Sequence, residues 1–525
     1  MLPSFFKKMN KKIVLIGANN RGNYVQGTFS RENLGLGYLE AYLLEAGFEV
    51  MVIDARLENS TPGRVAFEIS KFKPFFVGFS IIAKDGINWC ENVCQILKNN
   101  TKKTPHICIG SYFPTLQPER ALESMSSADS LIMGEGEITL KKLVQLLHAK
   151  KRWHNLLGLA YRSNSGIIIN KRRRLIKNLD KLPFPCHYVA KYGLKEFAIE
   201  GSRGCYCACS FCSISPFANA KTAKEKWRCR SAVKIVDEIE KLINEFPNTN
   251  TFRFVDPDFI GSIKHLNRLQ DFICEIKKRN LKISFIIDTR TEIINGVTDN
   301  IWKELHSIGL TEVYIGVENS SSNIKKMMLK RSTIEDDISA ICLLENLGIR
   351  VRFGFMMITP WSTSEDIENN AKLLRHFGFS RLDKYFQEMY LVPGTSAVKL
   401  INGKIKTWFD YGGEGEYYTY ELQSPIKELR QICRFLIENR NDFLSEIQKL
   451  HESVKSLEVS GENVDDLKNS INDFNYNIFI SIFKLSKNFS RLKDLSAIED
   501  SLDFLIDDYK SKLIIIEKKV ILYKN

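Results

Sequence analysis

The chain has 525 residues, of which 44% are hydrophobic and 26% are charged. This composition is typical of a folded globular protein, and the length suits about three domains. No apolar run reaches the roughly 18 residues that a transmembrane helix needs. Lysines follow too soon after the N-terminus for a secretory signal. We therefore expect a cytoplasmic protein without a membrane span.

The formal net charge is +13, which can indicate a nucleic-acid partner or an anionic substrate. The basic residues are scattered, apart from the run at 171–174, and they are not interleaved with aromatic residues. This distribution favours a solvated basic surface over a nucleic-acid interface. We expect a small-molecule or peptide substrate.

The first part of the chain alternates short apolar runs with amphipathic stretches, which predicts a parallel sheet covered by helices on both faces. The predicted strands lie at 11–17, 48–54, 75–80, 106–110 and 130–134. Ligands of such sheets bind beyond the carboxyl ends of the strands. The loops at that edge begin at Gly17, Ser80, Gly110 and Gly134.

A second alternating series predicts a curved, partial parallel barrel with six strand–helix units, whose active face is again the carboxyl end of its strands. Its predicted strands lie at 196–202, 251–256, 283–288, 312–318, 350–358 and 385–392. The remaining sequence has a helical apolar period and almost no Gly or Pro. We expect four segments, namely a doubly wound domain at 1–155, a connector at 156–195, the barrel at 196–420 and a helical domain at 421–525.

Four of the twelve cysteines crowd into residues 205–212, where Cys205, Cys209 and Cys212 fit the spacing C-x3-C-x2-C. Thiolates are the usual ligands of iron–sulfur clusters, and three of them leave one iron of a cubane open for chemistry. A structural zinc site would need four closed ligands, usually as two separated pairs. Cys207 could compete as a ligand, but we expect it to be a spectator. The other eight cysteines are expected to be packing residues.

The cysteine segment resembles the signature loop of the radical S-adenosylmethionine (SAM) superfamily, with an aromatic residue directly before the third cysteine. Segments similar to later motifs of that family follow in order, at 227–231, 254–259, 312–321, 354–363 and 392–396. The fifth-strand ending departs from the family's Gly-Pro-Gly and reads Thr359-Pro360-Trp361.

The resemblance implies a [4Fe-4S] cluster on the three cysteines and a bound SAM. The residues that it implies for SAM are Phe211, Asp256, Arg290, Glu318 and Gly354. Four of them have a plainer alternative: Asp256 could cap a helix, Arg290 could be a salt-bridge partner, Glu318 could be a solvated carboxylate at a strand end, and Phe211 could be a core aromatic.

Residues 11–150 resemble the cobalamin-binding domain that precedes the barrel in one class of this superfamily, most specifically at 134–137, GEGE. The residues implied for cobalamin are Gly17, Ser80, Gly110, Ser111, Gly134, Glu135 and Gly136. Glycines there permit a close approach of backbone to a bulky ligand. The Asp-x-His-x-x-Gly motif, whose His would ligate cobalt, is absent. The alternative is a flavodoxin-like scaffold that only shapes the substrate pocket.

The family chemistry is formation of a 5′-deoxyadenosyl radical at the cluster, which needs an electron donor such as a flavodoxin or ferredoxin. With cobalamin, the expected reaction is methyl transfer to an unactivated carbon or phosphorus. The alternatives are a cobalamin-using rearrangement or oxidative cyclisation without methylation, a methylthiotransferase that modifies tRNA or protein, and a non-enzymatic iron–sulfur electron-transfer protein. The methylthiotransferase family has three further cysteines in its N-terminal domain, and Cys90, Cys94 and Cys108 lack that spacing.

Overall fold

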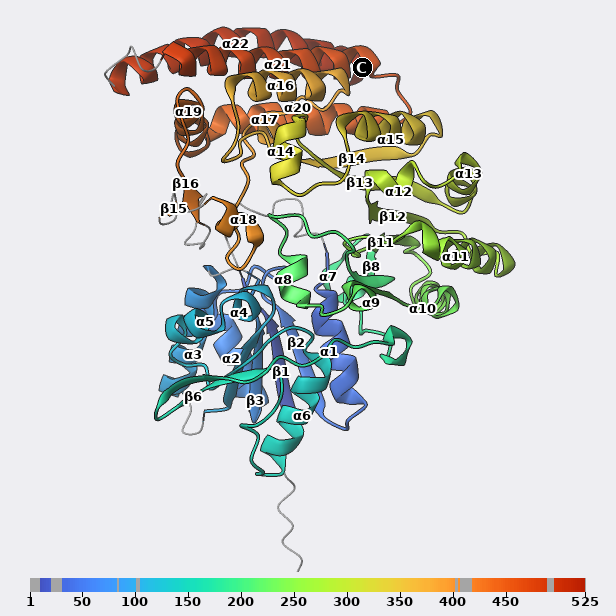
Figure 1. Cartoon of the computed structure of the whole chain (residues 1–525), viewed down its shortest axis with the longest axis vertical. Helices are drawn as coiled ribbons and strands as arrows, with labels where there is room; N and C mark the ends of the chain where they lie inside the picture. The colour runs from blue at the N-terminus through green and yellow to red at the C-terminus, as the bar shows by residue number, and fades with distance from the viewer. Residues whose placement is uncertain are drawn as a thin grey trace, which may run out of the picture.

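The computed structural model describes residues 10–19, 31–82, 85–100, 104–401, 405–406, 418–488 and 495–524. An N-terminal sheet with its helices, a second sheet with its helices, and a group of C-terminal helices follow one another along the long axis (Figure 1). This arrangement confirms the predicted α/β fold class with a helical C-terminal part.

The N-terminal sheet has seven strands in the order β2-β1-β3-β4-β5-β6-β7. The strands are β1 (Lys12–Gly17), β2 (Glu49–Asp54), β3 (Phe76–Ser80), β4 (His106–Gly110), β5 (Ser130–Ile132), β6 (Leu159–Ser163) and β7 (Gly166–Ile169). The helices are α1 (Leu34–Leu44), α2 (Pro62–Phe72), α3 (Asp85–Asn100), α4 (Tyr112–Leu116), α5 (Pro118–Ser124) and α6 (Glu137–His148). The order of the first five strands is that of flavodoxin-like folds.

The first five strands are parallel, as the alternation of strands and helices predicts. In this register Gly17 pairs with Ser80, and Ser80 pairs with Gly110, so these strand ends meet at one edge. The hairpin of β6 and β7 adds antiparallel to β5. Part of the stretch expected to be a connector therefore extends the N-terminal sheet, because its Leu159–Ser163 strand has the apolar residues to cover that edge.

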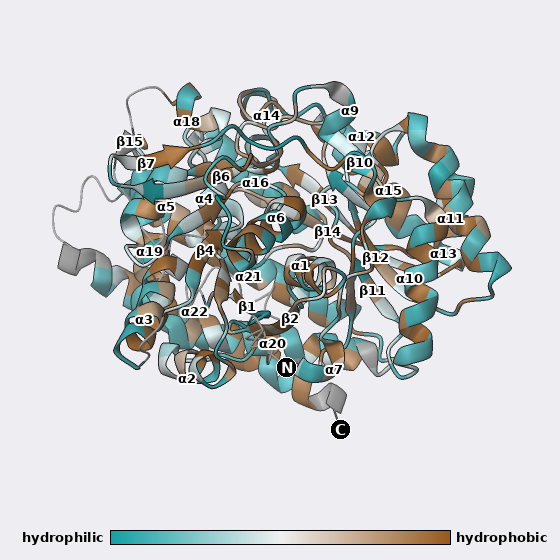
Figure 2. Ribbon diagram, turned by 90° about the horizontal axis from the view of Figure 1, so that it is seen from below, coloured by the Kyte–Doolittle hydropathy of each residue, from teal (hydrophilic) through white to brown (hydrophobic). Residues whose placement is uncertain are grey.

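The second sheet has five strands in the order β14-β13-β12-β11-β8, all parallel. The strands are β8 (Phe197–Ile199), β11 (Thr251–Phe254), β12 (Ser284–Thr289), β13 (Leu310–Glu318) and β14 (Arg350–Phe355). Helices α10 (Ala232–Glu245), α11 (Leu266–Lys278), α13 (Asp299–Ser307) and α15 (Ile334–Asn346) connect them, and α16 (Ser364–His376) follows the last strand. Figure 2 shows hydrophilic and hydrophobic residues alternating along helices such as α10 and α11, as in amphipathic helices.

The prediction of a sixth barrel strand at 385–392 is wrong, because the described residues form no regular strand there. Helix α17 (Leu382–Tyr385) takes its first residue, and only the isolated bridges Ile358–Glu388 and Leu391–Tyr418 follow. Pro393 closes the segment, and a proline cannot donate a backbone hydrogen bond to a ladder. The partial barrel therefore has five regular strands and one irregular edge.

The C-terminal part is helical, as the sequence predicts, with α19 (Ile426–Asn439), α20 (Asn441–Val459), α21 (Asp465–Asn488) and α22 (Leu495–Lys524). Helix α21 packs on α16, α19 and α22, which joins this group to the barrel (Figure 1). Within the described residues, no helix combines the length and the apolar character needed to cross a membrane.

Candidate functional site

The cysteine loop lies between two short strands that pair antiparallel beside the barrel, β9 (Ser202–Gly204) directly before it and β10 (Trp227–Cys229) further along the chain. We call this strand pair the β9–β10 hairpin. Ser210, in the middle of this loop, is fully buried. Its amide donates to the carbonyl of Met328 at 2.8 Å, and its hydroxyl donates to the carbonyl of Met327 at 3.0 Å. Its own carbonyl accepts from the amide of Ala397 at 2.8 Å. The loop is thus held by the segments that follow the fourth and sixth barrel units.

The thiols of the loop lie close together, with Cys207 between Cys205 and Cys209. Hydrogen bonds from both of those thiols lower the pKa of the Cys207 thiol, and the nearby Arg290 adds to this effect. Nη1 of Arg290 donates to Sγ of Cys207 at 3.2 Å. Cys207, expected to be a spectator, is therefore engaged by an arginine.

No group of three or more His, Cys, Asp or Glu in the described residues is arranged to hold one metal ion. Ligands to different irons of a cubane do not need to meet at one point, so the cysteine loop fits a cluster better than a single ion. A hydrogen bond with Cys207 and burial raise the pKa of the Cys209 thiol, burial raises the pKa of Cys212, and Lys330 partly offsets both rises. Cations near thiols favour the thiolate form that a cluster requires.

Two of the residues predicted for SAM, Glu318 and Gly354, lie side by side at the carboxyl ends of β13 and β14. Glu318 has φ +68°, a conformation that favours glycine, next to a register shift in the sheet. A Cβ on Gly354 would lie 2.6 Å from the hydroxyl of Tyr314 and 3.4 Å from Oε2 of Glu318. Strained residues concentrate at functional sites. Burial raises the pKa of Glu318, and Lys330 counteracts this rise from 3.9 Å away.

Two other predicted residues, Asp256 and Arg290, are tied to the protein itself. Asp256 is buried and accepts from the amide of Gly201 at 2.8 Å, and burial raises its pKa to about 7. Nε of Arg290 donates to Asp258 at 2.8 Å, in line with the salt-bridge alternative. Phe211 is partly buried and packs against the barrel core.

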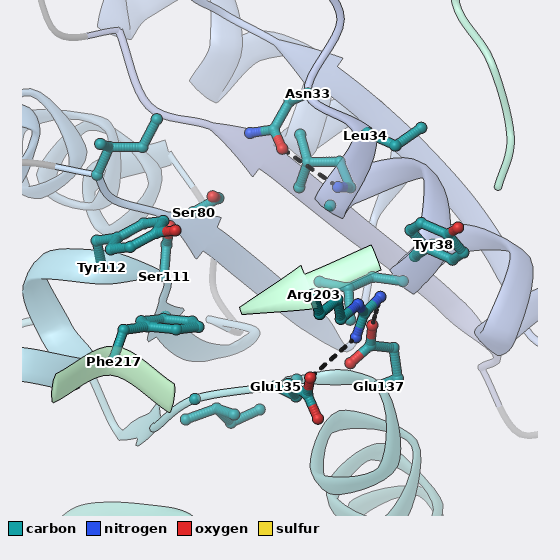
Figure 3. A pocket seen from close by; sticks show the side chains of 18 of the residues that line it. Asn33, Leu34, Tyr38, Ser80, Ser111, Tyr112, Glu135, Glu137, Arg203 and Phe217 are labelled. Carbon is teal, nitrogen blue, oxygen red and sulfur yellow. Dashed lines mark hydrogen bonds and ion pairs between the residues drawn. The ribbon is translucent and has the colours of Figure 1, made fainter. Parts of the chain in front are cut away.

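A cavity of about 500 Å³ lies between the N-terminal sheet and the β9–β10 hairpin. All residues predicted for cobalamin except Gly17 line it, namely Ser80, Gly110, Ser111, Gly134, Glu135 and Gly136. Figure 3 labels Ser80, Ser111 and Glu135 among them. The space in front of Gly17 is taken instead by Asp54 and Leu36. Small residues at the ends of adjacent strands leave room for a bulky ligand against the backbone, which fits a corrinoid.

Several lining residues were not predicted from the sequence. Tyr112 on α4 stacks on Phe217 of helix α8 (Ile214–Ala218), with ring centroids 4.4 Å apart, and both face the cavity (Figure 3). Tyr112 follows Ser111, whose φ of +88° is also in the glycine-favoured region. Arg203 and Arg228, on the hairpin beside the cysteine loop, complete the opposite wall. The signal for Tyr112 in the sequence was a bulky residue two positions after Gly110, the glycine that ends β4.

Cys90, Cys94 and Cys108 lie in the cores of the N-terminal domain, each at most 3% exposed. Burial raises the pKa of Cys94 and of Cys108 to about 12, so these thiols are poor metal ligands.

Two family models match the chain. The B12 binding domain matches residues 28–144, and the Radical SAM superfamily matches residues 199–374. The first match covers most of the cavity-forming strands, and the second includes the cysteine loop and all five barrel strands except the first two residues of β8.

Among proteins of known sequence, the chain is 28% identical over 348 residues to an uncharacterized methyltransferase of Pyrococcus horikoshii. It is 27% identical over 353 residues to the anaerobic magnesium-protoporphyrin IX monomethyl ester cyclase of Rubrivivax gelatinosus. Each alignment covers 65% of this chain, and they cover 72% and 61% of the two relatives.

Among solved structures, the fold is similar to the cobalamin-dependent SAM radical enzyme OxsB with aqua-cobalamin bound. The TM-score is 0.75 at 18% identity, over 98% of this chain and 80% of the other. These matches confirm the resemblance drawn from the motifs, and with it the expected cluster, SAM and cobalamin. The chain is a radical SAM enzyme that carries a B12-binding domain before its barrel.

Proposed function

We propose that this enzyme transfers a methyl group to an unactivated carbon or phosphorus of a small-molecule or peptide substrate. The observation that carries the proposal is a single cavity with two kinds of wall. One wall consists of strand ends of the B12-binding domain, such as Ser80 and Gly110. The other includes Gly204 and Ile214, which flank the cysteine loop. A substrate in this cavity would meet both cofactor sites.

When bound, the cluster and SAM supply a carbon-centred radical, and cobalamin supplies a methyl group. The chain contributes binding and orientation. Cys205, Cys209 and Cys212 would hold the cluster, and the buried Ser210 fixes their loop through three backbone partners. Glu318 and Gly354, which are neighbours at the strand ends, would bind SAM. The Tyr112–Phe217 pair closes one side of the cavity and helps to exclude water, which protects a reactive radical.

A second candidate is a cobalamin-using rearrangement or cyclisation without net methylation. The observation that favours it is that a similar protein, from Rubrivivax gelatinosus, is named a cyclase. The two candidates share every cofactor site, so the products distinguish them. Methyl transfer consumes the methyl group of SAM, whereas rearrangement leaves only 5′-deoxyadenosine or unchanged SAM.

The test is anaerobic reconstitution of the full chain with iron, sulfide and hydroxocobalamin, followed by metal analysis and absorbance. We expect about four irons and one cobalt for each chain. A chain in which Cys205, Cys209 and Cys212 are all replaced by alanine is the control, and it should keep cobalt while losing iron. Turnover with SAM carrying a deuterated methyl group, and with a flavodoxin or ferredoxin as the electron donor, then reports on methylation. Absence of cobalt from the reconstituted protein would contradict the proposal.

A further inference from the structure

Two arginines and two glutamates connect the B12-binding domain to the β9–β10 hairpin, whose strands enclose the cysteine loop in sequence. Glu135 lies in the loop after β5, Glu137 is the first residue of α6, and Arg203 and Arg228 face each other across β9 and β10. Nη2 of Arg203 lies 2.7 Å from Glu137, and its Nη1 lies 3.5 Å from Glu135. Nη1 of Arg228 donates to the same oxygen of Glu135 at 2.8 Å. We call these four side chains the interdomain bridge.

The interdomain bridge is buried, and its charges depend on one another. The side chains of its members are between 6% and 14% exposed. Two arginines at directly opposite positions of a hairpin repel each other, and Glu135 lies between them. Glu200 adds a contact to Arg203 at 2.7 Å, and Tyr38 lies under the same guanidinium, 5.2 Å from it (Figure 3). Removing one charge leaves a buried partner uncompensated, which is costly.

The bridge reaches both cofactor sites. Its glutamates and arginines line the cavity. Arg203 precedes Cys205 by two residues, and only Gly204 lies between them. Gly204 has φ +90°, and a side chain there would clash with the carbonyl of Lys226, the residue directly before β10. The hairpin is therefore closely fitted, and a shift of the cysteine loop must move Arg203 and, with it, the wall formed by Glu135 and Glu137.

We propose that the interdomain bridge couples the two cofactor sites, with Glu135, Glu137 and Arg203 as positioning residues. Assembly of the cluster fixes the cysteine loop, the loop fixes Arg203, and Arg203 fixes the glutamate wall of the cavity. Cobalamin then binds to a wall that is already ordered and loses less conformational entropy. Because such coupling is reciprocal, bound cobalamin also stabilises the cluster. This inference rests on the proposed function, since it requires both cofactors.

The experiment is a titration of the full chain with hydroxocobalamin under anaerobic conditions, followed by absorbance. One sample carries the reconstituted cluster, and the other has lost its iron to a chelator. The measured quantity is the ratio of the two dissociation constants. For the parent chain we expect binding at least about 5-fold tighter with the cluster present, the lower end of typical coupling between sites. For Arg203→Gln and for Glu137→Gln the ratio should approach one.

Arg279→Gln is the matched control. Arg279 also contacts three carboxylates, of Asp237, Glu240 and Glu275, at 2.8–2.9 Å, but it does so among the outer barrel helices. Its loss should lower the melting temperature without changing the ratio, so a merely structural role of Arg203 is separated from coupling. Glu137→Gln keeps the shape of the side chain and serves as the test if Arg203→Gln does not fold.

The possible outcomes separate the coupling from the proposed function. If neither form of the parent chain binds cobalamin, the proposed function falls and the coupling falls with it. If both forms bind with equal affinity, the function stands and the coupling is refuted. The coupling is equally refuted if the folded bridge variants keep the ratio of the parent chain. A ratio that collapses in the bridge variants and persists in Arg279→Gln supports it.

Discussion

At the scale of single residues, the four neighbouring cysteines differ in what surrounds them. Cys207 is 9% exposed, and its sulfur accepts a hydrogen bond from Arg290, which Asp258 in turn holds at 2.8 Å. Cys209 has no such arginine, and its neighbouring charge comes from Lys330. From the spacing of the sequence motif we expect Cys207 to support the loop and not to be one of the three ligands.

Replacing single cysteines tests this distinction. Cys209→Ala removes a ligand, and we expect it to lose most of the iron of the reconstituted chain. Cys207→Ala should retain about as much iron as the parent chain, because its sulfur is engaged by Arg290. Iron and sulfide analysis with absorbance spectra provides the measurement. Equal iron loss in the two variants would show that Cys207 is a ligand after all.

The two carboxylates predicted for SAM, Glu318 and Asp256, should differ in how strongly their replacement weakens SAM binding. Glu318 stands beside Gly354 at the strand ends, whereas Asp256 is buried and bonded to the amide of Gly201. A lost hydrogen bond to a charged group costs about 1.5–3 kcal/mol, so Glu318→Gln should weaken SAM binding about 10-fold or more. The change of the reduced-cluster electron paramagnetic resonance spectrum on adding SAM reports the affinity.

Asp256→Asn is the counterpart to Glu318→Gln. It should leave the SAM affinity within about 2-fold and lower the stability instead, because Asp256 uses its carboxylate to join the end of β11 to the segment between β8 and β9. If Asp256→Asn weakened SAM binding as strongly as Glu318→Gln, Asp256 would have to contact SAM as the sequence motif implies.

At the scale of elements, the β9–β10 hairpin depends on Gly204. The backbone there has φ +90°, and a side chain would meet the carbonyl of Lys226. We expect Gly204→Ala to destabilise the chain by about 2–3 kcal/mol, the sum of backbone strain and overpacking, and to impair cluster assembly. Urea unfolding and iron content measure the two effects.

Gly166→Ala provides the comparison for this element. Gly166 joins β6 to β7 with φ +116°, and nothing lies within 4 Å of a Cβ placed there. Gly166→Ala should lower the free energy of unfolding by about 1 kcal/mol, through backbone strain alone, and leave the iron content unchanged. If Gly204→Ala and Gly166→Ala lowered the free energy of unfolding equally, the close approach of Gly204 to Lys226 would not constrain the hairpin.

The regular elements were largely predictable because their apolar periodicity is local. Strand ends such as Ser80 and Gly110 followed from the same pattern, since parallel strands end at one edge. The prediction of a sixth barrel strand was wrong because an apolar run does not show which backbone N–H and C=O groups will form hydrogen bonds with a neighbouring strand. Contacts such as Glu137 with Arg203 join residues far apart in sequence, and a single sequence contains no signal for them.

At the scale of the whole molecule, the B12-binding domain and the barrel also meet at a buried histidine. His187 lies between Glu32, at 2.7 Å, and Glu238 of helix α10, at 3.2 Å. Glu32 also accepts from the amides of Tyr188 at 2.7 Å and Ala198 at 3.1 Å. Glu32 therefore fixes the start of the barrel to the N-terminal domain, and a charged His187 extends this connection to α10.

The charge of His187 makes the stability of the molecule depend on pH. Burial disfavours the imidazolium, but the hydrogen bonds to Glu238 and Glu32 outweigh it and raise the pKa from 6.5 to about 9. A group with a raised pKa in the folded state stabilises the fold fully below its unfolded pKa. The contribution should therefore be complete below pH 6.5 and disappear as the pH rises through 9. The size of the effect is about 3 kcal/mol.

Urea unfolding of the parent chain across this interval should show a falling free energy of unfolding, and His187→Gln should flatten the curve. His451→Gln is the control, because burial lowers the pKa of His451 to about 4 and its contribution is lost only as the pH falls. The decline between pH 6.5 and 9 should thus persist in His451→Gln. A decline of the same size in His187→Gln would mean that other groups titrate at the interface, and that His187 does not join the two domains through its charge.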